Sequence, residues 1–357
     1  AILRILTAGV LAGVLIESGA AAKIAETIVE KIGESRALIA LAIATMVLTM
    51  VGVFVDVSVI TVSPIALAIA HKSGLSKPAI LLAMVGGGKA GNIMSPNPNT
   101  IAAADNLGVS LTNVMIAGIV PAIFGVIITC ILASRIKQKG SLVESDEHMK
   151  ELTDMPGFLP AMVGPLVAII LLMLRPIAGI AIDPLIALPV GGICGILAMG
   201  KIKHINKYAT YGLAKMSGVA ILLIGTGTLA GIIANSGLKD VIISGINALG
   251  LPSFMLAPVS GILMSAATAS TTSGTAVATS VFGPTIVQLG VAPLATAAMI
   301  HAGATVLDHL PHGSFFHATG GSVSMDMKER LKLIPYESLV GLTMTIVSTI
   351  IFGIILK

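Results

Sequence analysis

The sequence predicts an all-α polytopic membrane protein, and three observations support this fold class. First, 55% of the 357 residues are hydrophobic and only 11% are charged, whereas soluble domains carry about 25% charged residues. Second, the mean hydropathy of +1.00 is far above that of a soluble chain. Third, apolar runs such as MVGPLVAIILLML and TMTIVSTIIFGIIL match membrane helices and lack the alternation of a membrane barrel.

Most apolar segments are long enough to cross a bilayer. We predict transmembrane helices at residues 1–16, 78–105, 113–134, 157–175, 183–199, 212–234, 291–318 and 335–356. Two further regions, 37–71 and 252–287, are interrupted by FVDVSVITVSP and AATASTTSGTAVATS. Backbone that leaves a helix at membrane depth must be satisfied by protein or by a water-filled cavity. We therefore interpret both regions as re-entrant hairpins.

Lysine and arginine are unevenly distributed between the predicted loops. The basic loops are 135–156, 200–211 and 321–334, and the predicted spans place all three on one side, while loop 235–251 is nearly uncharged. The basic side of a membrane protein is cytoplasmic, so the first hairpin opens inward and the second outward. We expect no nucleic-acid partner, because no basic run with interleaved aromatic residues exists. Cys130 and Cys194 have no CxxC spacing and are interpreted as packing residues.

Two parts of the chain resemble each other. AGVLIESG at 12–19 returns as AGIIANSG at 230–237, and four residues return at an offset of 215, namely Pro78, Met84, Gly88 and Pro96 as Pro293, Met299, Gly303 and Pro311. An odd number of crossings in the second half makes this an inverted repeat, as in many secondary transporters. We assign residues 1–135 to the first repeat, 136–156 to a cytoplasmic linker and 157–357 to the second repeat. By symmetry, we expect two further helices, together about 60 residues, to precede residue 1.

Both repeats contain a polar segment broken by proline at an equivalent place, MSPNPNT at 94–100 and HLPHGSF at 309–315. Such a segment opens the helix, so that the N-terminal end of a half-helix favours an anion and free carbonyl groups favour a cation. We therefore predict a binding site at the bilayer midplane. Its candidate residues in the two breaks are Asn92, Ser95, Asn97, Asn99, Thr100, Gly313 and Ser314.

The tips of the two predicted hairpins are rich in hydroxyl groups that can hydrogen-bond a carboxylate or a sugar. The alternative is that each hydroxyl bonds back to its own helix or packs against a neighbour. The clustering of six hydroxyls within eight residues favours a site at the second tip. The candidates are Ser58 and Thr61 in the first tip and Ser270, Thr271, Thr272, Ser273, Gly274 and Thr275 in the second.

Charged residues inside predicted spans need a reason, because a charge at the bilayer centre costs at least about 2.5–3.5 kcal/mol. We consider three roles for Lys89. It could attract a substrate carboxylate, form an ion pair with an aspartate such as Asp56, or extend its ammonium group to the membrane interface. Asp56 carries a coupling proton or is the partner of that lysine. Asp308, His309 and His312 suit proton coupling, because imidazole titrates near neutral pH. Their spacing matches no zinc pattern, so we expect no metal and no cofactor.

The whole chain resembles the gluconate permease (GntP) family, within a superfamily of elevator-type ion transporters. The resemblance runs through AGVLIESGAAAKIAETI, FVDVSVITVSPIAL, NIMSPNPNTIAAA, SGTAVATSVFGP and LDHLPHGSFFHATGGSVSMDMKERLK. It implies a non-enzymatic, proton-coupled carrier for gluconate and similar sugar acids in the inner membrane, assembled as a homo-oligomer in contact with lipid. By position, it implies functional roles for Asp56, for residues Ser95 to Thr100, for residues Ser273 to Ala278 and for His309.

This chain differs from the sugar-acid carriers at two positions of the resemblance. It has Asn97 where those members have histidine, and Pro311-His312 where they have an Asn-Asp pair. Other substrates therefore stay open, namely citrate, another hydroxy acid or a small amino acid such as D-serine, as does coupling to sodium. A channel would need a continuous polar stripe along one axis, and two hairpins that open to opposite faces argue against a channel. A membrane metalloenzyme is the most distant alternative, with Asp308, His309 and His312 as its ligands.

Overall fold

The computed structural model describes residues 2–143, 155–234 and 252–356, together with residues 237, 244, 245 and 250. These residues form helices and connecting turns, and the only β-pairing among them is an isolated bridge between Ser76 and Leu142. The predicted loop at 235–251, the repeated segment 230–237 and the linker 136–156 lie partly or wholly outside the described residues. The all-helical fold class is confirmed.

The described residues of the first half form eight α-helices. They are α1 (Ile2–Glu17), α2 (Ala20–Ile32), α3 (Ala37–Met50), α4 (Val55–Ser73), α5 (Lys77–Asn92), α6 (Pro98–Asn106), α7 (Leu111–Ala117) and α8 (Ile119–Arg135). The described helices of the second half are α9 (Phe158–Ala178), α10 (Pro184–Ala198), α11 (Ile205–Ala234), α13 (Leu256–Thr268), α14 (Thr271–Val281), α15 (Gly283–Gln288), α16 (Pro293–Gly303), α17 (Ser314–Ser322) and α18 (Met327–Thr349). A π-helical turn, Ile350–Ile355, extends α18.

Both predicted broken helices are present, each as two half-helices. α5 and α6 replace the span predicted at 78–105, and α16 and α17 replace the span at 291–318, with α17 continuing to Ser322. The predicted hairpins correspond to α3 with α4 and to α13 with α14. α4, α5 and α6 begin at residues 55, 77 and 98, and α14, α16 and α17 begin at residues 271, 293 and 314, each 216 residues later. The order and spacing of these elements therefore repeat along the chain.

The sequence analysis did not predict α2 as a helix, and this is a correction. α2 follows α1 after a turn at Gly19, whose φ of 78° is left-handed, and the two helices meet at an angle of 60°. It is amphipathic, with small apolar residues buried and its charged residues, such as Lys23 and Glu30, on the other face. A helix with this much charge does not resemble a membrane span, which is why the hydropathy pattern misses it.

Few helices of this fold are individually long enough to cross a bilayer. Among the described residues, four helical segments meet the length and hydropathy that a span requires, and the bent pair of α1 and α2 is a fifth. The four are α4, α9, α7 with α8 (Leu111–Arg135), and α18 with its π-helical end (Met327–Ile355). Among the described hairpin arms and half-helices, α4 alone reaches this length. The others are shorter, because two of them share the thickness that one span covers.

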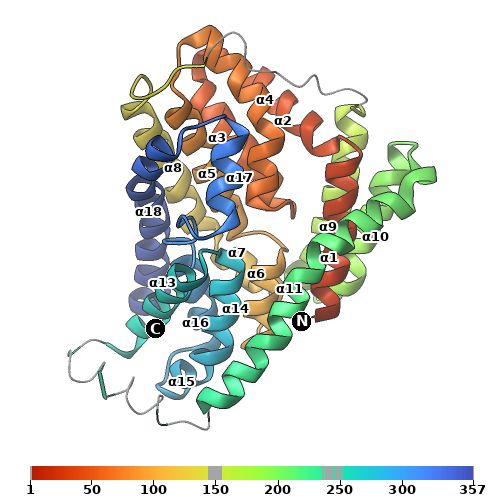
Figure 1. Cartoon of the computed structure of the whole chain (residues 1–357). Helices are drawn as coiled ribbons and strands as arrows, with labels where there is room; N and C mark the ends of the chain where they lie inside the picture. Colours follow the sequence, from red (N-terminus) through yellow and green to blue (C-terminus); the bar gives the residue numbers. More distant parts are fainter. Residues whose placement is uncertain are drawn as a thin grey trace.

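The helices form two groups that lie side by side (Figure 1). α1 packs against α10 and α11, and α9 packs against α10, which makes a peripheral group at the right of the figure. The larger group contains both hairpins, both broken helices, α8 and α18. In the same view, α3, α4 and α5 lie in the upper part of this group, and α13, α14 and α16 lie in the lower part.

α5 is the centre of the larger group, because every residue from Lys77 to Asn92 is buried. Isoleucine side chains on the outer helices are exposed instead, including Ile127 of α8 at 50%, Ile170 of α9 at 58% and Ile346 of α18 at 49%. Exposed apolar side chains of this size are expected where a protein faces lipid hydrocarbon. The fold is therefore that of a multi-pass membrane protein.

α1 and α11 approach each other at glycine residues. A Cβ atom added at Gly212 would lie 1.7 Å from the carbonyl oxygen of Gly9, and one added at Gly13 would lie 2.2 Å from the carbonyl oxygen of Tyr208. Gly9 and Gly13 have the GxxxG spacing that lets membrane helices approach closely. Both obstacles are backbone atoms, which cannot rotate away.

Gly212→Ala is expected to separate α1 from α11 and to lower the thermal stability of the purified protein in detergent by about 1–3 kcal/mol. Gly218→Ala is the matched control on the same helix, since nothing lies within 4 Å of a Cβ atom at that position. The effect is measured from melting curves in which size-exclusion chromatography gives the folded fraction at each temperature. Equal melting temperatures for the two variants would contradict the close contact.

Candidate functional site

Asn97 shapes the break between α5 and α6. Its side-chain oxygen accepts hydrogen bonds from the backbone N–H groups of Asn99 at 3.0 Å and Thr100 at 3.1 Å, which caps the N-terminal end of α6. Its amide nitrogen donates to the carbonyl oxygen of Asn92 at 2.8 Å, at the last residue of α5. Pro98 occupies the first position of α6, where no N–H group is needed. One buried side chain thus satisfies backbone groups on both sides of the break.

Lys89 reaches from α5 into the second break, which covers residues 304–313 between α16 and α17. Its ammonium nitrogen Nζ donates to the carbonyl oxygen of Thr305 at 2.8 Å and lies 2.6 Å from Oδ1 of Asp308. It also lies 2.8 Å from Nδ1 of His309. All these side chains are buried. The ion-pair partner of Lys89 is therefore Asp308, and not Asp56.

The two breaks and the two hairpin tips enclose a polar cavity of about 170 Å³. It is lined by Phe54, Val55, Asp56, Asn92, Asn99, Ala269, Ser270, Thr271, Thr272, Asp308, Ser314 and Phe315. These residues include the first turns of α4, α6, α14 and α17. The N-terminal ends of four helices therefore converge on one cavity, and each carries partial positive charge.

The tip of the second hairpin is hydrogen-bonded to both breaks. Thr271 Oγ1 donates to Oδ2 of Asp308, and Thr272 Oγ1 donates to Oδ1 of Asn99, each at 2.5 Å. Ser270 caps α14 by accepting from the N–H group of Ser273 at 3.2 Å. Ala269 at the tip has a positive φ of 47°. The hydroxyl groups of Thr271 and Thr272 thus link the tip of the second hairpin to one polar residue of each break.

Gly313 lets the second break approach this tip. A Cβ atom added at Gly313 would lie 2.6 Å from both the Cβ atom and the carbonyl oxygen of Ala269. The residue is the N-cap of α17 and has no side chain to offer as a cap. Its role in the structure is close packing of the backbone.

Asp56 is in the first turn of α4 and lines the cavity from the side of the first hairpin. Its side chain is half-buried. Among the described residues, no hydrogen-bond donor or cation pairs with its carboxylate. An acidic side chain in the first turn of a helix is favoured by the helix dipole. Asp56 thus differs from Asp308, whose carboxylate is fully engaged.

The structure brings together eight of the twenty predicted site residues around the cavity. They are Asp56, Asn92, Asn99, Ser270, Thr271, Thr272, Asp308 and Ser314. The other twelve do not line it, namely Ser58, Thr61, Lys89, Ser95, Asn97, Thr100, Ser273, Gly274, Thr275, His309, His312 and Gly313. Asn97, Lys89 and Gly313 shape the breaks instead, and His312 is exposed.

Two buried charged residues of α18 extend the network around His309. Arg330 forms a two-pronged ion pair with Glu337, whose Oε2 lies 3.9 Å from Nδ1 of His309. Arg330 also donates to the carbonyl oxygen of Phe316 at 3.3 Å and lies over its ring at 4.7 Å. The pair therefore fixes α17, whose first residues line the cavity.

The sequence analysis placed Arg330 in a cytoplasmic loop and did not select Glu337. A usable signal exists, since the two residues are seven positions apart and lie on one face of a helix. Their neighbours Lys328, Glu329 and Lys332 conceal it, because a run of mixed charges resembles an exposed loop.

His309 has hydrogen-bond partners at both ring nitrogens. Its Nε2 lies 3.0 Å from the carbonyl oxygen of Ile334, which fits a proton on Nε2. Its Nδ1 lies 3.0 Å from Oδ1 of Asp308 and close to Lys89. With the proton on Nε2, Nδ1 accepts a hydrogen bond from the ammonium group of Lys89 at 2.8 Å.

In the metalloenzyme alternative, Asp308, His309 and His312 would be the metal ligands. Across the described ranges, no group of three or more histidine, cysteine, aspartate or glutamate side chains is arranged to hold a metal ion. The ammonium group of Lys89 occupies the place between Asp308 and His309 that a cation would take.

An all-helical membrane fold whose interrupted helices enclose a polar cavity defines a membrane transporter. A family model described as GntP family permease matches residues 1–355. The chain belongs to the GntP permease family. This confirms the resemblance drawn from the sequence motifs.

Known proteins similar to this chain agree with this class. It is 68% identical over 355 residues to an uncharacterized transporter of Haemophilus influenzae, which covers 99% of this chain and 85% of the relative. It is 24% identical over 348 residues to a gluconate permease of Bacillus licheniformis, covering 86% and 76% of the two chains. The fold is similar to that of the YdaH transporter of Alcanivorax borkumensis, with a TM-score of 0.71, 18% identity and coverage of 98% and 85%.

Lys89→Met is expected to destabilise the fold by about 3–5 kcal/mol, because it leaves the carboxylate of Asp308 buried without its cation. Adding Asp308→Asn should recover part of this loss, since the remaining group is neutral. Denaturation midpoints of the purified variants measure both effects. Lys23→Met is the control, because it breaks a pair with Glu26 at the surface of α2 and should change stability little. A double variant no more stable than Lys89→Met would contradict the pairing.

Proposed function

We propose that the protein is a secondary active symporter that imports a small hydroxylated carboxylate, gluconate or a related sugar acid, with protons across the inner membrane. The observation that carries the proposal is the convergence of four helix N-terminal ends on one cavity. Helix N-terminal ends favour anions, because they carry partial positive charge, and at α4 and α17 no side chain caps the first N–H groups. Gathered around one cavity, they suit the carboxylate of the solute.

The rest of the cavity wall suits the hydroxyl groups of a sugar acid. Ser270, Thr271, Thr272 and Ser314 contribute hydroxyls, and Asn92 and Asn99 contribute amides, each of which can donate and accept. Apolar contact comes from the ring of Phe315. The similarity to a gluconate permease of Bacillus licheniformis supports this substrate class. Citrate, other hydroxy acids and D-serine are the competing substrates to test.

Asp56 is the proposed carrier of the coupling proton. Its carboxylate lines the cavity beside the bound anion, and within the described part of the chain it has no partner that would keep it charged. Binding an anion next to a carboxylate favours protonation of that carboxylate, because two negative charges repel at short distance. Asp308 and His309 are proposed as secondary proton sites through their shared hydrogen bond, and His312 as a more distant one.

Lys89 and Asn97 are proposed to act on the substrate through the groups that they hold. Lys89 fixes Asp308, and Asn97 fixes the backbone N–H group of Asn99 and with it the first turn of α6. Thr100 donates its hydroxyl group to Oδ1 of Asn97, and the N–H group of Ser273 donates to the cap residue Ser270. The other predicted contacts are Ser58, Thr61, Ser95, Gly274, Thr275 and Gly313. Direct contact between these residues and the substrate stays a prediction.

Alternating access follows if the larger helix group moves against the group of α1, α9, α10 and α11. The recurrence of helix starts at an interval of 216 residues supports two related halves. Inverted halves exchange roles when the carrier turns from one side to the other. We propose an inverted repeat, an elevator-type movement and a homo-oligomer that anchors the peripheral group in the lipid bilayer.

Labelled gluconate should accumulate in proteoliposomes that contain the protein when an inward proton gradient is imposed. A gradient of one pH unit corresponds to about 1.4 kcal/mol, or roughly tenfold accumulation for one proton per anion. Citrate and D-serine serve as competitors, and protein-free liposomes as the blank. Accumulation driven by a sodium gradient alone would mean that sodium, and not the proton, is the coupling ion. Transport that responds to neither gradient would contradict symport.

Asp56→Asn is expected to abolish proton-driven accumulation while retaining exchange of labelled for unlabelled anion, because exchange needs no net proton transfer. Asp326→Asn is the matched control, since this exposed carboxylate lies outside the cavity. Both variants are assayed in the same proteoliposomes for uptake and for exchange. Full accumulation by Asp56→Asn would remove this residue from the coupling step.

A further inference from the structure

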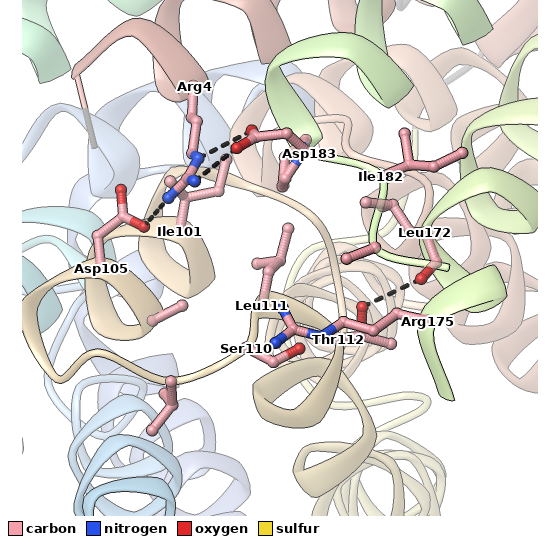
Figure 2. A pocket seen from close by; sticks show the side chains of 14 residues that line it. Arg4, Ile101, Asp105, Ser110, Leu111, Thr112, Leu172, Arg175, Ile182 and Asp183 are labelled. Carbon is pink, nitrogen blue, oxygen red and sulfur yellow. Dashed lines mark hydrogen bonds and ion pairs between the residues drawn. The ribbon is translucent and has the colours of Figure 1, made fainter. Parts of the chain in front are cut away.

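A second cavity lies where the two helix groups meet (Figure 2). It has a volume of about 190 Å³, and its wall includes residues of α1, α6, α7, α9 and α10. Charged side chains from both groups line it, namely Arg4, Arg175 and Asp183 from the peripheral group and Asp105 from the larger group. None of these residues takes part in the cavity enclosed by the hairpin tips.

Arg4 holds a carboxylate of each group at once. Its Nε donates to Oδ1 of Asp183 at 2.9 Å, and its Nη2 donates to Oδ2 of the same residue at 2.6 Å. Its Nη1 donates to Oδ1 of Asp105, as Figure 2 shows. Two parallel bonds orient the guanidinium group within the peripheral group. Its remaining edge faces α6, which belongs to the other group.

Asp105 is in the last turn of α6, where a negative charge is unfavourable. The C-terminal end of a helix carries partial negative charge, so an aspartate there needs a nearby cation. Arg4 supplies that cation from across the boundary, and the Asp105 side chain is only 16% exposed. The boundary between the groups therefore contains a charge pair that neither group completes alone.

α6 connects this pair to the substrate cavity. The helix has nine residues, with Asn99 near its first turn in one cavity and Asp105 at its other end in the second cavity. A straight helix of this length spans about 14 Å. Since α6 is short and its first turn is buried, a displacement of Asp105 displaces the cavity wall that Asn99 forms.

We infer that Arg4 and Asp105 are positioning residues for transport, because their ion pair holds α6 and the cavity wall at Asn99 in the arrangement of this structure. The pair separates when the larger group moves against the peripheral group, whereas the bond between Arg4 and Asp183 is kept. The inference rests on the alternating access of the proposed function, and it assigns one contact that sets the balance between the two access states.

The test measures access to the cavity and needs no substrate. A reporter cysteine replaces Ser314, which lines the cavity, in a chain that also carries Cys130→Ala and Cys194→Ala. A membrane-impermeant maleimide is applied to either side of vesicles with a known orientation. The ratio of labelling rates from the two sides reports the balance of access states.

Asp105→Asn should change this ratio by about twofold to tenfold, the effect expected for loss of one partly buried ion pair. Arg175→Gln is the matched control, because Arg175 lines the same cavity and has no ion pair among the described residues. It should leave the ratio unchanged. The conservative variant Asp105→Glu keeps a carboxylate for Arg4 and leaves the bonds between Arg4 and Asp183 in place, so it should retain the parental ratio that Asp105→Asn shifts.

Three results would overturn the inference. They are an unchanged ratio in folded Asp105→Asn, an equal shift in Arg175→Gln, and a shift in Asp105→Glu as large as that in Asp105→Asn. A lower melting temperature of Asp105→Asn with an unchanged ratio would mean that the pair only stabilises the fold. Failure of proton-driven uptake in the parent protein would contradict the symport proposal and not this ion pair.

Discussion

The structure depends on one cation that closes an interrupted helix inside the membrane. Open backbone groups cannot be left to hydrocarbon, and Lys89 satisfies the carbonyl group of Thr305 while neutralising Asp308. The lysine is on α5, whose residues are all buried, so its ammonium group lies in protein and not in lipid. Asp308, once fixed, accepts the hydroxyl group of Thr271 and thereby anchors the second hairpin. Loss of this contact would release several elements together.

Helix N-terminal ends and charged side chains have different roles around the cavity. The helix ends provide partial positive charge at the cavity wall, and the ion pairs behind the wall hold the broken helices in place. The positive ends of α4, α6, α14 and α17 attract an anion, and the carboxylate of Asp56 sits among them with no partner in the described part of the chain. Behind Asp308, the pair of Arg330 and Glu337 balances its own charge and holds α17. The fixed ions cancel one another. In the proposed mechanism, the solute and the proton would therefore set the net charge of the site.

Much of this arrangement could be predicted from composition and proline placement. Interrupted hydropathy located both breaks and the tip of the second hairpin, because proline, glycine and clustered hydroxyls are costly in a membrane unless they serve a site. Ser58 and Thr61, predicted at the first tip, lie inside α4, and the turn between α3 and α4 precedes them. The pattern could not identify the partner of Lys89, since only the fold brings α5 beside residue 308. The hydropathy pattern also missed α2, which carries several charges of its own. It missed the pair of Arg330 and Glu337, because the charged residues next to Arg330 are typical of an exposed loop. Which hydroxyl groups face the cavity depends on where α14 begins.

The closed tip of the second hairpin has a consequence for binding strength. Thr271 and Thr272 already donate hydrogen bonds to Asp308 and Asn99. A polar solute that recruits these four groups exchanges existing bonds for new ones, and the net gain of each exchange is small. For the proposed substrate we therefore expect modest affinity and rapid release, which a carrier needs as much as capture. Turnover would therefore suffer if this wall were left unpaired before the solute arrived.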